Sequence, residues 1–518
     1  MSSITLVGFL MLLDSSIVST AVPKITSEFH SLDDVGWYGT SYLLASCALQ
    51  PLSGKFYSLF NNKGTFLSFF AIFEVGSALS GAAQSSNMLI IGRAVSGIGA
   101  SGLLNGAYTI IHAGTVPKKS PGLIGIIMAI SSFGLLCGPL IGGALTQHAS
   151  WRWCFYINLP CGAFVATALL LISLPDHSGK VVKLYTPISL LRELDIVGFT
   201  VFAGFSIMLL LALNWGGTSY GWNSSVIIGL FCGAGAALIV FVIWEAYKGA
   251  DAMIPLYLVA RRVVWTSCIN YWFFTGCAMV ITYFLPIYFQ AVRGASPTMS
   301  GVDLLPSILP AMIFAGLTGG LVGRLGYYLP FGVTSGVLLT IANGLLSMLM
   351  PTTPTARWIG FQILHGVGRG LGLQIPLLAV QHNCAKNELS VLTALVVFSQ
   401  QFGGSVFLSL AQVIFSSELR RSLTIHAPTA NASAIIATGA TSIRKIVPAA
   451  SLPGVLLSYS NAVDQVMYLA TGAAGGALIF ALGMGWTDIR KKPPVKVPVK
   501  DERPEAIIAE DKASGSMV

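Results

Sequence analysis

Charged side chains are scarce in this chain. Asp, Glu, Lys and Arg make up 9% of its 518 residues, whereas soluble domains carry about 25%. Hydrophobic residues make up 54%, and the mean hydropathy is +0.75. A soluble fold of this length could not bury so much apolar surface, so a membrane must form part of the protein's surroundings.

The sequence also lacks the patterns of metal sites, nucleotide sites and disulfide frameworks. The seven histidines never stand four residues apart, and no Walker A pattern occurs. The net charge of +9 is dispersed, apart from a basic cluster near the C-terminus, which disfavours nucleic acid as a partner. We therefore expect no metal, no cofactor and no enzymatic activity. The eight cysteines lie in or beside apolar segments and read as small hydrophobic residues: Cys47, Cys137, Cys154, Cys161, Cys232, Cys268, Cys277 and Cys384.

Long apolar segments are abundant instead. A membrane-spanning helix takes about 20 residues, and fourteen segments qualify. They lie near 4–22, 36–53, 65–83, 88–112, 122–145, 153–174, 196–214, 225–244, 264–289, 301–321, 331–350, 358–380, 390–416 and 464–486. Most connections are short and leave no room for a sizeable soluble domain. The sequence predicts an all-α polytopic membrane protein built as one helical bundle.

Lys and Arg in the connections predict the orientation. With the N-terminus in the cytosol, the inner connections hold twelve of these residues and the short outer ones hold four. Both termini are then cytoplasmic and the number of crossings is even. Residues 417–463 form a long outward loop, and the Pro-rich, charged residues 490–518 form a disordered tail. Glycosylation sequons at Asn223 and Asn431 fall on the expected outer face.

Three ionisable side chains stand inside apolar segments of the first third of the chain. Asp14 lies near the centre of the first segment, where a carboxylate costs about 2.5–3.5 kcal/mol on insertion scales. Arg93 cannot lose its proton, and pairing with Asp14 would satisfy it. Glu74 lies halfway along the third segment. Two interpretations stay open for each residue: coupling of transport to protons, or a structural polar contact.

Further polar and aromatic candidates lie in the second half of the chain. In HGVGRGLGLQIP, His365 and Arg369 stand four residues apart, on one helix face, and Gln374 follows. The arginine opposes protonation of the histidine, which favours a polar pair lining a cavity over a proton relay. The aromatic segment 264–289 includes Tyr283 and Tyr288, which belong either to an interfacial belt or to an apolar substrate wall.

The stretch FGLLCGPLIGG, 133–143, holds five residues that break helices in water. In lipid, Gly134, Gly138 and Gly142 form a smooth stripe that allows another helix to approach closely, and Pro139 can kink the helix. Gly143 extends the same small-residue region. The stripe is interpreted as a packing seam, and a seam between two halves of the bundle would also let them slide.

These motifs together resemble the major facilitator superfamily, specifically its 14-helix drug:proton antiporter branch, and within it fungal multidrug and toxin efflux pumps. The passages 151–160 (WRWCFYINLP) and 283–306 are also similar to that branch. The resemblance covers almost the whole chain. Its single-residue matches are Asp14, Ala21, Pro23, Arg93, Gly97, Gly134, Gly138, Pro139, Gly142 and Gly143.

The resemblance implies a major facilitator fold with two six-helix halves, 1–174 and 263–489. A cytoplasmic linker and two further helices would be inserted between them, at 175–262. It implies alternating access, in which proton influx drives export of a hydrophobic or amphipathic small molecule. The implied partners are that molecule, protons and the bilayer, in a monomer at the plasma membrane or the vacuolar membrane. The alternative is proton-coupled exchange of another solute, such as basic amino acids or iron chelates.

One connection departs from the superfamily pattern. In GKFYSLFNNKG, Gly54 and Lys63 match, but Ser58 replaces the expected Asp and Asn62 replaces a basic residue. Gly54 and Lys63 are therefore candidates for a cytoplasmic gating loop that lacks the usual charge latch.

Overall fold

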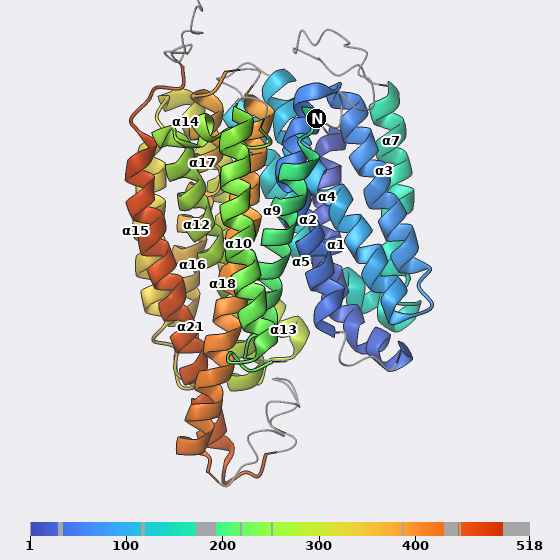
Figure 1. Ribbon diagram of the computed structural model, residues 1–518. Coiled ribbons are helices and arrows are strands. Elements are labelled where there is room, and N and C mark those ends of the chain that lie inside the picture. The colour runs from blue at the N-terminus through green and yellow to red at the C-terminus, as the bar shows by residue number, and fades with distance from the viewer. Residues whose placement is uncertain are drawn as a thin grey trace, which may run out of the picture.

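The computed structural model describes residues 2–29, 35–114, 120–171, 193–217, 220–249, 252–385, 388–428, 444 and 447–490. Their regular structure is helical apart from two isolated β-bridges. The helices stand roughly side by side (Figure 1). They are α1 (Ser2–Phe29), α2 (Val35–Leu59), α3 (Asn62–Gly81), α4 (Ser86–Gly114), α5 (Ser120–His148), α6 (Trp153–Tyr156), α7 (Asn158–Leu171), α9 (Ile196–Trp215), α10 (Ser225–Lys248), α11 (Leu256–Val259), α12 (Arg262–Ile287), η3 (Tyr288–Val292), α13 (Pro297–Asp303), α14 (Leu305–Leu325), α15 (Leu329–Leu346), α16 (Thr355–Gly372), α17 (Ile375–His382), α18 (Leu389–His426), α21 (Leu452–Ala481) and η4 (Leu482–Met484).

Many helices of this bundle are long and apolar enough to cross a membrane. Among the described residues, eleven helical stretches are long and apolar enough to cross a bilayer, and α1 adds a shorter apolar stretch, Ser3–Val18. The start of α1 and the end of α21 lie at the same end of the bundle, and the end of α18 and the start of α21 lie at the other (Figure 1). The protein is therefore an all-helical, multi-pass membrane protein.

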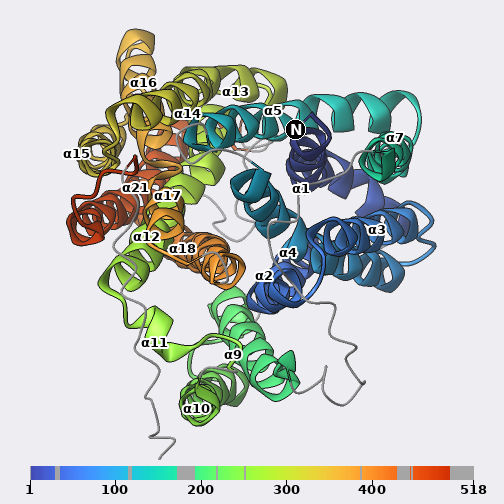
Figure 2. The same ribbon diagram turned by 90° about the horizontal axis from the view of Figure 1, so that it is seen from above.

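Two groups of helices are visible when the bundle is seen from above (Figure 2). The helices α1 to α7 lie on one side, and α12 to α21 lie on the other. The main packing contacts between the groups are those of α2 with α18 and of α5 with α14, and α4 also touches α18. The helices α9 and α10 pair with each other at the edge, where α9 also touches α2 and α18.

Matching glycines let α4 and α16 pack tightly within their own groups. A Cβ atom on Gly97 of α4 would collide with the carbonyl oxygen of Tyr42 in α2. Likewise, a Cβ atom on Gly366 of α16 would collide with the carbonyl oxygen of Ser307 in α14. Helix backbones in membranes approach this closely only where a side chain is absent. The same contact thus occurs once in each group.

Local sequence signals set several helix ends. The side chains of Asn61, Asp195 and Ser224 accept hydrogen bonds from backbone N–H groups in the first turns of α3, α9 and α10. Gly326 directly follows α14 with a φ of 87°, a backbone conformation that a side chain would strain. These ends keep the connections short, as the sequence predicts.

The expected outward loop 417–463 is shorter than predicted. Helix α18 continues to His426, and α21 already begins at Leu452, so both ends of that range are helical. The prediction ended each segment where hydropathy fell, but a helix needs apolar residues only inside the bilayer. Residues 417–426 are polar and still favour a helix. The two helices therefore project beyond the ends of the neighbouring helices (Figure 1).

Candidate functional site

Asp14 and Arg93 form a buried ion pair inside the first group of helices. The distance between Arg93 Nη1 and Asp14 Oδ2 is 2.6 Å, and the two residues are 1% and 0% exposed. Arg93 Nε also donates to the carbonyl oxygen of Tyr38 at 3.1 Å, and its guanidinium lies 4.6 Å from the Tyr42 ring centre. The expected pairing of Asp14 with Arg93 is present, and Nε, Nη1 and the guanidinium face of the arginine each have a partner.

A further polar residue, Asn158, completes the environment of Asp14. Asn158 Nδ2, at the start of α7, donates to Asp14 Oδ1 at 3.1 Å and lies 3.1 Å from Ser77 Oγ of α3. Helices α1, α3, α4 and α7 thus meet in one polar cluster. Sequence reasoning missed Asn158, although an Asn within the apolar passage WRWCFYINLP was the available signal.

Glu74 of α3 has no such environment. Both of its carboxylate oxygens are buried and lack a hydrogen-bond partner among the described residues. The carboxylate lies against Gly162 of α7, where a Cβ atom would collide with it. It is also close enough to Asp14 for the two negative charges to repel each other. A buried carboxylate without partners favours a site that binds a proton over a packing contact.

The glycine stripe of α5 allows close approach, as predicted, but its partner is α1. A Cβ atom on Gly134 would collide with the backbone of Phe9, and one on Gly138 would collide with Ser16 and the backbone of Ile17. Because α1 belongs to the same group as α5, the interpretation of Gly134 and Gly138 as a sliding seam between halves is wrong. Another face of α5 meets α14.

Other members of the same motif differ from one another. Gly142 is buried and its carbonyl oxygen lies 3.8 Å from the Cys154 thiol. Gly143 has open space around its Cβ position. Pro139 lies within helix α5, which continues to His148. Within this motif, Gly134 and Gly138 pack against α1, whereas Gly143 lies on a side of α5 with open space.

Gly54 lies inside α2 and not in a loop, which corrects the predicted gating loop. A Cβ atom there would stand 2.8 Å from the Ala394 side chain and 3.0 Å from the Ser390 carbonyl oxygen, both in α18. Gly54 is therefore a point where the two groups touch. Lys63 Nζ donates to the carbonyl oxygen of Leu170 at 2.9 Å, a contact within the first group.

An ion pair fixes the α18 side of this contact region. Arg261, just before α12, donates to both oxygens of Glu388, just before α18, at 2.7 and 2.8 Å. These hydrogen bonds raise the pKa of the Arg261 guanidinium above its usual value. The paired geometry is the strong, bidentate kind. It holds the beginnings of α12 and α18 together.

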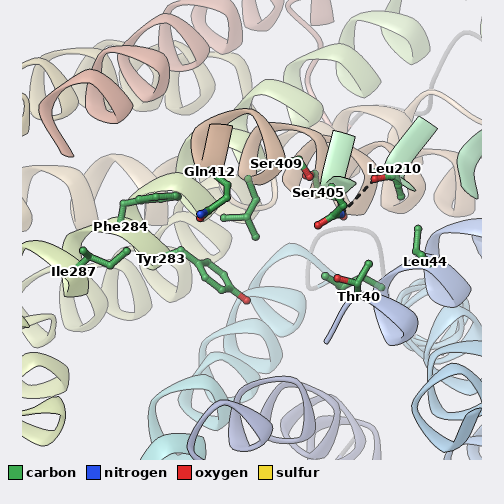
Figure 3. Close-up of a pocket in the computed structure, with 12 residues that line it drawn as sticks. Thr40, Leu44, Leu210, Tyr283, Phe284, Ile287, Ser405, Ser409 and Gln412 are labelled. Carbon is green, nitrogen blue, oxygen red and sulfur yellow. Dashed lines mark hydrogen bonds between the residues drawn. The ribbon is translucent and has the colours of Figure 1, made fainter. Parts of the chain in front are cut away.

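A cavity of about 250 Å³ lies between α2, α9, α12 and α18 (Figure 3). The Tyr283 ring extends from α12 toward Thr40 of α2, while Gln412 and Ser405 come from α18. Leucine and phenylalanine side chains cover the rest of the wall, so the cavity is suited to an amphipathic molecule. The lining residues are Thr40, Leu43, Leu44, Leu210, Asn214, Tyr283, Phe284, Ile287, Ser405, Leu408, Ser409 and Gln412.

Among the predicted cavity residues, only Tyr283 lines this cavity. Tyr288 is 0% exposed, and its hydroxyl donates to the carbonyl oxygen of Met350 at 2.8 Å, so its assignment to a substrate wall is wrong. Sequence reasoning missed the lining residues of α2, α9 and α18. Single polar residues such as Thr40 and Gln412 in apolar segments carry too little pattern to identify them.

The other three candidates lie in or beside α16. His365 Nδ1 is 2.9 Å from Asn343 Oδ1 of α15. Arg369 Nη1 lies 3.4 Å from Thr282 Oγ1 of α12, and Gln374 Nε2 donates to the carbonyl oxygen of Ala315 at 3.0 Å. None of them reaches the cavity in Figure 3. They form a separate polar region within the second group.

The two predicted glycosylation sites differ in what can be said of them. Asn223 is exposed and lies just before α10. Asn431 lies outside the described residues.

Comparison with known proteins agrees with this architecture. Residues 4–252 match the family model described as Major Facilitator Superfamily. The chain is 54% identical over 504 residues to the MFS-type transporter pigP of Monascus ruber, covering 97% of this chain and 88% of pigP. It is 53% identical over 499 residues to the efflux pump mlcE of Penicillium citrinum, covering 95% of this chain and 90% of mlcE.

A solved structure has the same fold. The proton:xylose symporter XylE aligns with a TM-score of 0.58 at 13% identity, over 95% of this chain and 96% of XylE. At this identity, the likeness concerns the fold alone. With its long helices, its two joined groups and relatives that match almost the whole chain, this protein belongs to the major facilitator superfamily and is a membrane transporter, not an enzyme.

Proposed function

We propose that this protein is a proton-coupled antiporter that exports hydrophobic or amphipathic small molecules by alternating access. The observation that carries the proposal is the buried Asp14–Arg93 pair beside the unpartnered carboxylate of Glu74. A purely structural pair needs no second acid next to it. Relatives named as efflux pumps support outward transport.

In the proposed coupling step, a proton changes the charge of Asp14 and so the strength of its ion pair with Arg93. A proton that binds Asp14 removes the negative charge facing Arg93, so the ion pair weakens. Arg93 then keeps only the Tyr38 carbonyl and nearby rings, which is a poor environment for a buried cation. Glu74 can take up the proton first, because its buried carboxylate has no hydrogen-bond partner among the described residues and a proton removes its uncompensated charge. Release of the proton to the cytosol restores the pair.

The membrane arrangement is part of the same proposal. The chain makes fourteen crossings, with six-helix halves at 1–174 and 263–489 and two inserted helices, α9 and α10, within 175–262. The matching glycine contacts of α4 and α16 support a repeat of the halves. Both termini face the cytosol and the protein acts at the plasma membrane, with residues 490–518 as a cytoplasmic tail. The protein works as a monomer.

The cavity in Figure 3 is proposed as part of the cargo path. It lies where α2 of the first half, α12 and α18 of the second half and the inserted α9 meet. Its mixed lining offers hydroxyl and amide groups to a polar end and leucine side chains to an apolar body. Rocking of the halves moves α2 relative to α12 and α18, so a cavity between them changes shape during transport.

The deciding experiment imposes a pH gradient on pump-deficient cells that express the protein. Accumulation of a panel of amphipathic dyes is measured with the outside acidic and again after a protonophore has collapsed the gradient. We expect lower accumulation of some dyes only while the gradient exists. Export that persists without any gradient would overturn proton coupling, and equal accumulation in cells without the protein would overturn export.

A further inference from the structure

The interior face of α16 carries four polar side chains, here named the polar stripe: Trp358, Gln362, His365 and Arg369. Successive members stand four, three and four residues apart, so they share one helix face. Ile363 on the opposite face is 44% exposed, whereas Gln362 and His365 are 0% and 1% exposed. The polar stripe therefore faces the inside of the second group, and Ile363 faces lipid.

Three members of the polar stripe hold a buried polar atom without a partner among the described residues. These atoms are Trp358 Nε1, Gln362 Oε1 and His365 Nε2. Other atoms of the same side chains are bonded, since Gln362 Nε2 donates to the Asp303 carbonyl and His365 Nδ1 contacts Asn343. A buried polar atom left unpaired is costly, so a stripe of them indicates a polar occupant.

Arg369 adds a fixed positive charge to the polar stripe at the middle of the membrane. It is the fifteenth of 28 residues in the span Thr355–His382. Among the described residues, its one side-chain hydrogen bond goes to Thr282 at 3.4 Å, and no carboxylate forms an ion pair with it. A guanidinium stays charged at physiological pH, so this charge is not neutralised by the described residues.

Arg93 shows what a well-paired arginine looks like in the same protein. Its charge meets a carboxylate at 2.6 Å, a carbonyl oxygen at 3.1 Å and two aromatic rings. Arg93 is 1% exposed, whereas Arg369 is partly exposed although it sits mid-helix on an interior face. Part of the Arg369 surface is therefore not covered by the described residues.

We propose that Arg369 binds the carboxylate of an amphipathic cargo as its ionic partner. A guanidinium matches the planar, two-oxygen geometry of a carboxylate and neutralises one negative charge. The unpaired atoms Gln362 Oε1 and His365 Nε2 are hydrogen-bond acceptors, so they suit hydroxyl groups on the body of the same cargo. This inference rests on the proposed export function and makes organic carboxylates a preferred substrate class.

Paired probes test the proposal directly. Purified full-length protein is titrated with 1-pyrenebutyrate and with its methyl ester, which lacks the negative charge and carries one additional methyl group. Arg369→Gln is expected to weaken binding of the acid about 10- to 100-fold, the usual worth of a charged hydrogen bond, and to leave ester binding within about twofold. Arg369→Lys should recover part of the loss for the acid.

A matched control removes the same charge elsewhere on α16. Arg357→Gln lies at the exposed start of the helix, so binding of both probes should stay unchanged. Thermal unfolding of each variant shows whether it is folded. Three results would overturn the anion site. Folded Arg369→Gln could lose the same affinity for the acid and the ester, or lose affinity for neither. The wild-type protein could also fail to bind the acid.

Transport separates this inference from the proposed function. Export of the methyl ester from proteoliposomes under a pH gradient reports the antiporter activity without a carboxylate. If the ester is exported but the affinity for the acid does not depend on Arg369, the anion site alone is refuted. If the acid binds selectively through Arg369 but neither probe is exported under the gradient, the anion site is supported and the export proposal is refuted.

Discussion

At the scale of single residues, this transporter handles intramembrane charge in two ways. Asp14 and Arg93 neutralise each other at 2.6 Å. Glu74 and Arg369 have no ionic partner among the described residues. A charge without a partner at membrane depth is expensive, and such residues usually serve transport. In our proposals, Asp14 and Arg93 couple proton binding to the packing of the helices. Glu74 binds a proton, and Arg369 binds the cargo.

Asp14→Asn is expected to abolish gradient-driven export. The amide cannot carry the proton, and it leaves Arg93 as a buried cation, a change that costs about 3–5 kcal/mol when a buried pair is broken. Dye accumulation under an acidic outside pH is the measurement, with protein at the membrane quantified in the same cells. Glu418→Gln, which breaks only a 3.7 Å surface pair, should export normally. Undiminished export by Asp14→Asn would refute the coupling role.

At the scale of helices, glycines decide which elements can touch. The stripe on α5 lies against α1, and Gly54 on α2 lies against α18. The spacing of Gly134, Gly138 and Gly142 predicted close approach correctly, because that depends only on the helix period. It could not name the partner helix, since every neighbour of α5 is equally compatible with a smooth face.

Gly138→Leu is expected to destabilise the protein by about 1–3 kcal/mol or more, because its side chain would collide with Ser16 and the Ile17 backbone. Thermal unfolding monitored by tryptophan fluorescence measures the loss. Gly143→Leu on the same helix points into open space and should change stability by about 0.5 kcal/mol or less. Equal stability of the two variants would contradict the α1–α5 packing.

Gly54→Val is expected to push α2 and α18 apart, because its Cβ alone would stand 3.0 Å or less from Ser390, Val391 and Ala394. Hydrogen–deuterium exchange in the first turns of α18 should then rise. Gly39→Val in the outer part of α2 meets nothing within 4 Å and serves as the control. Equal exchange in α18 for both variants would contradict a close contact between Gly54 of α2 and the start of α18.

At the scale of the whole molecule, the cavity exists only because helices from distant parts of the chain meet. Leu210 of α9, Thr40 of α2, Tyr283 of α12 and Gln412 of α18 line one space of about 250 Å³ (Figure 3). Leu210 and Asn214 of α9 form one wall of this space. The inserted helix α9 therefore shapes the cargo path in our proposal.

Leu210→Trp is expected to reduce export of bulky dyes more than export of small ones, because it adds volume to the cavity wall. A size series of amphipathic dyes, scored by accumulation, measures the shift. Ile207→Trp on the same helix is the control, since Ile207 is 36% exposed and does not line the cavity. A uniform loss for all sizes would indicate general damage and not a filled cargo path.

The sequence by itself determined the membrane environment, the helices and the need of Arg93 for a partner. Hydropathy and helix length are properties of short segments, so they can be read locally. It misjudged where α18 ends and α21 begins, because hydropathy stops at the bilayer while hydrogen bonding continues along the helix.

The tertiary structure alone decided the contacts between distant segments. It brought Asn158 to Asp14, turned Tyr288 into the packed core, placed Tyr283 in a cavity and gave Arg369 no carboxylate partner among the described residues. Which side chains meet depends on how each helix is rotated and which neighbour it faces. That rotation is set by packing over the whole bundle, and a single segment of sequence does not contain it.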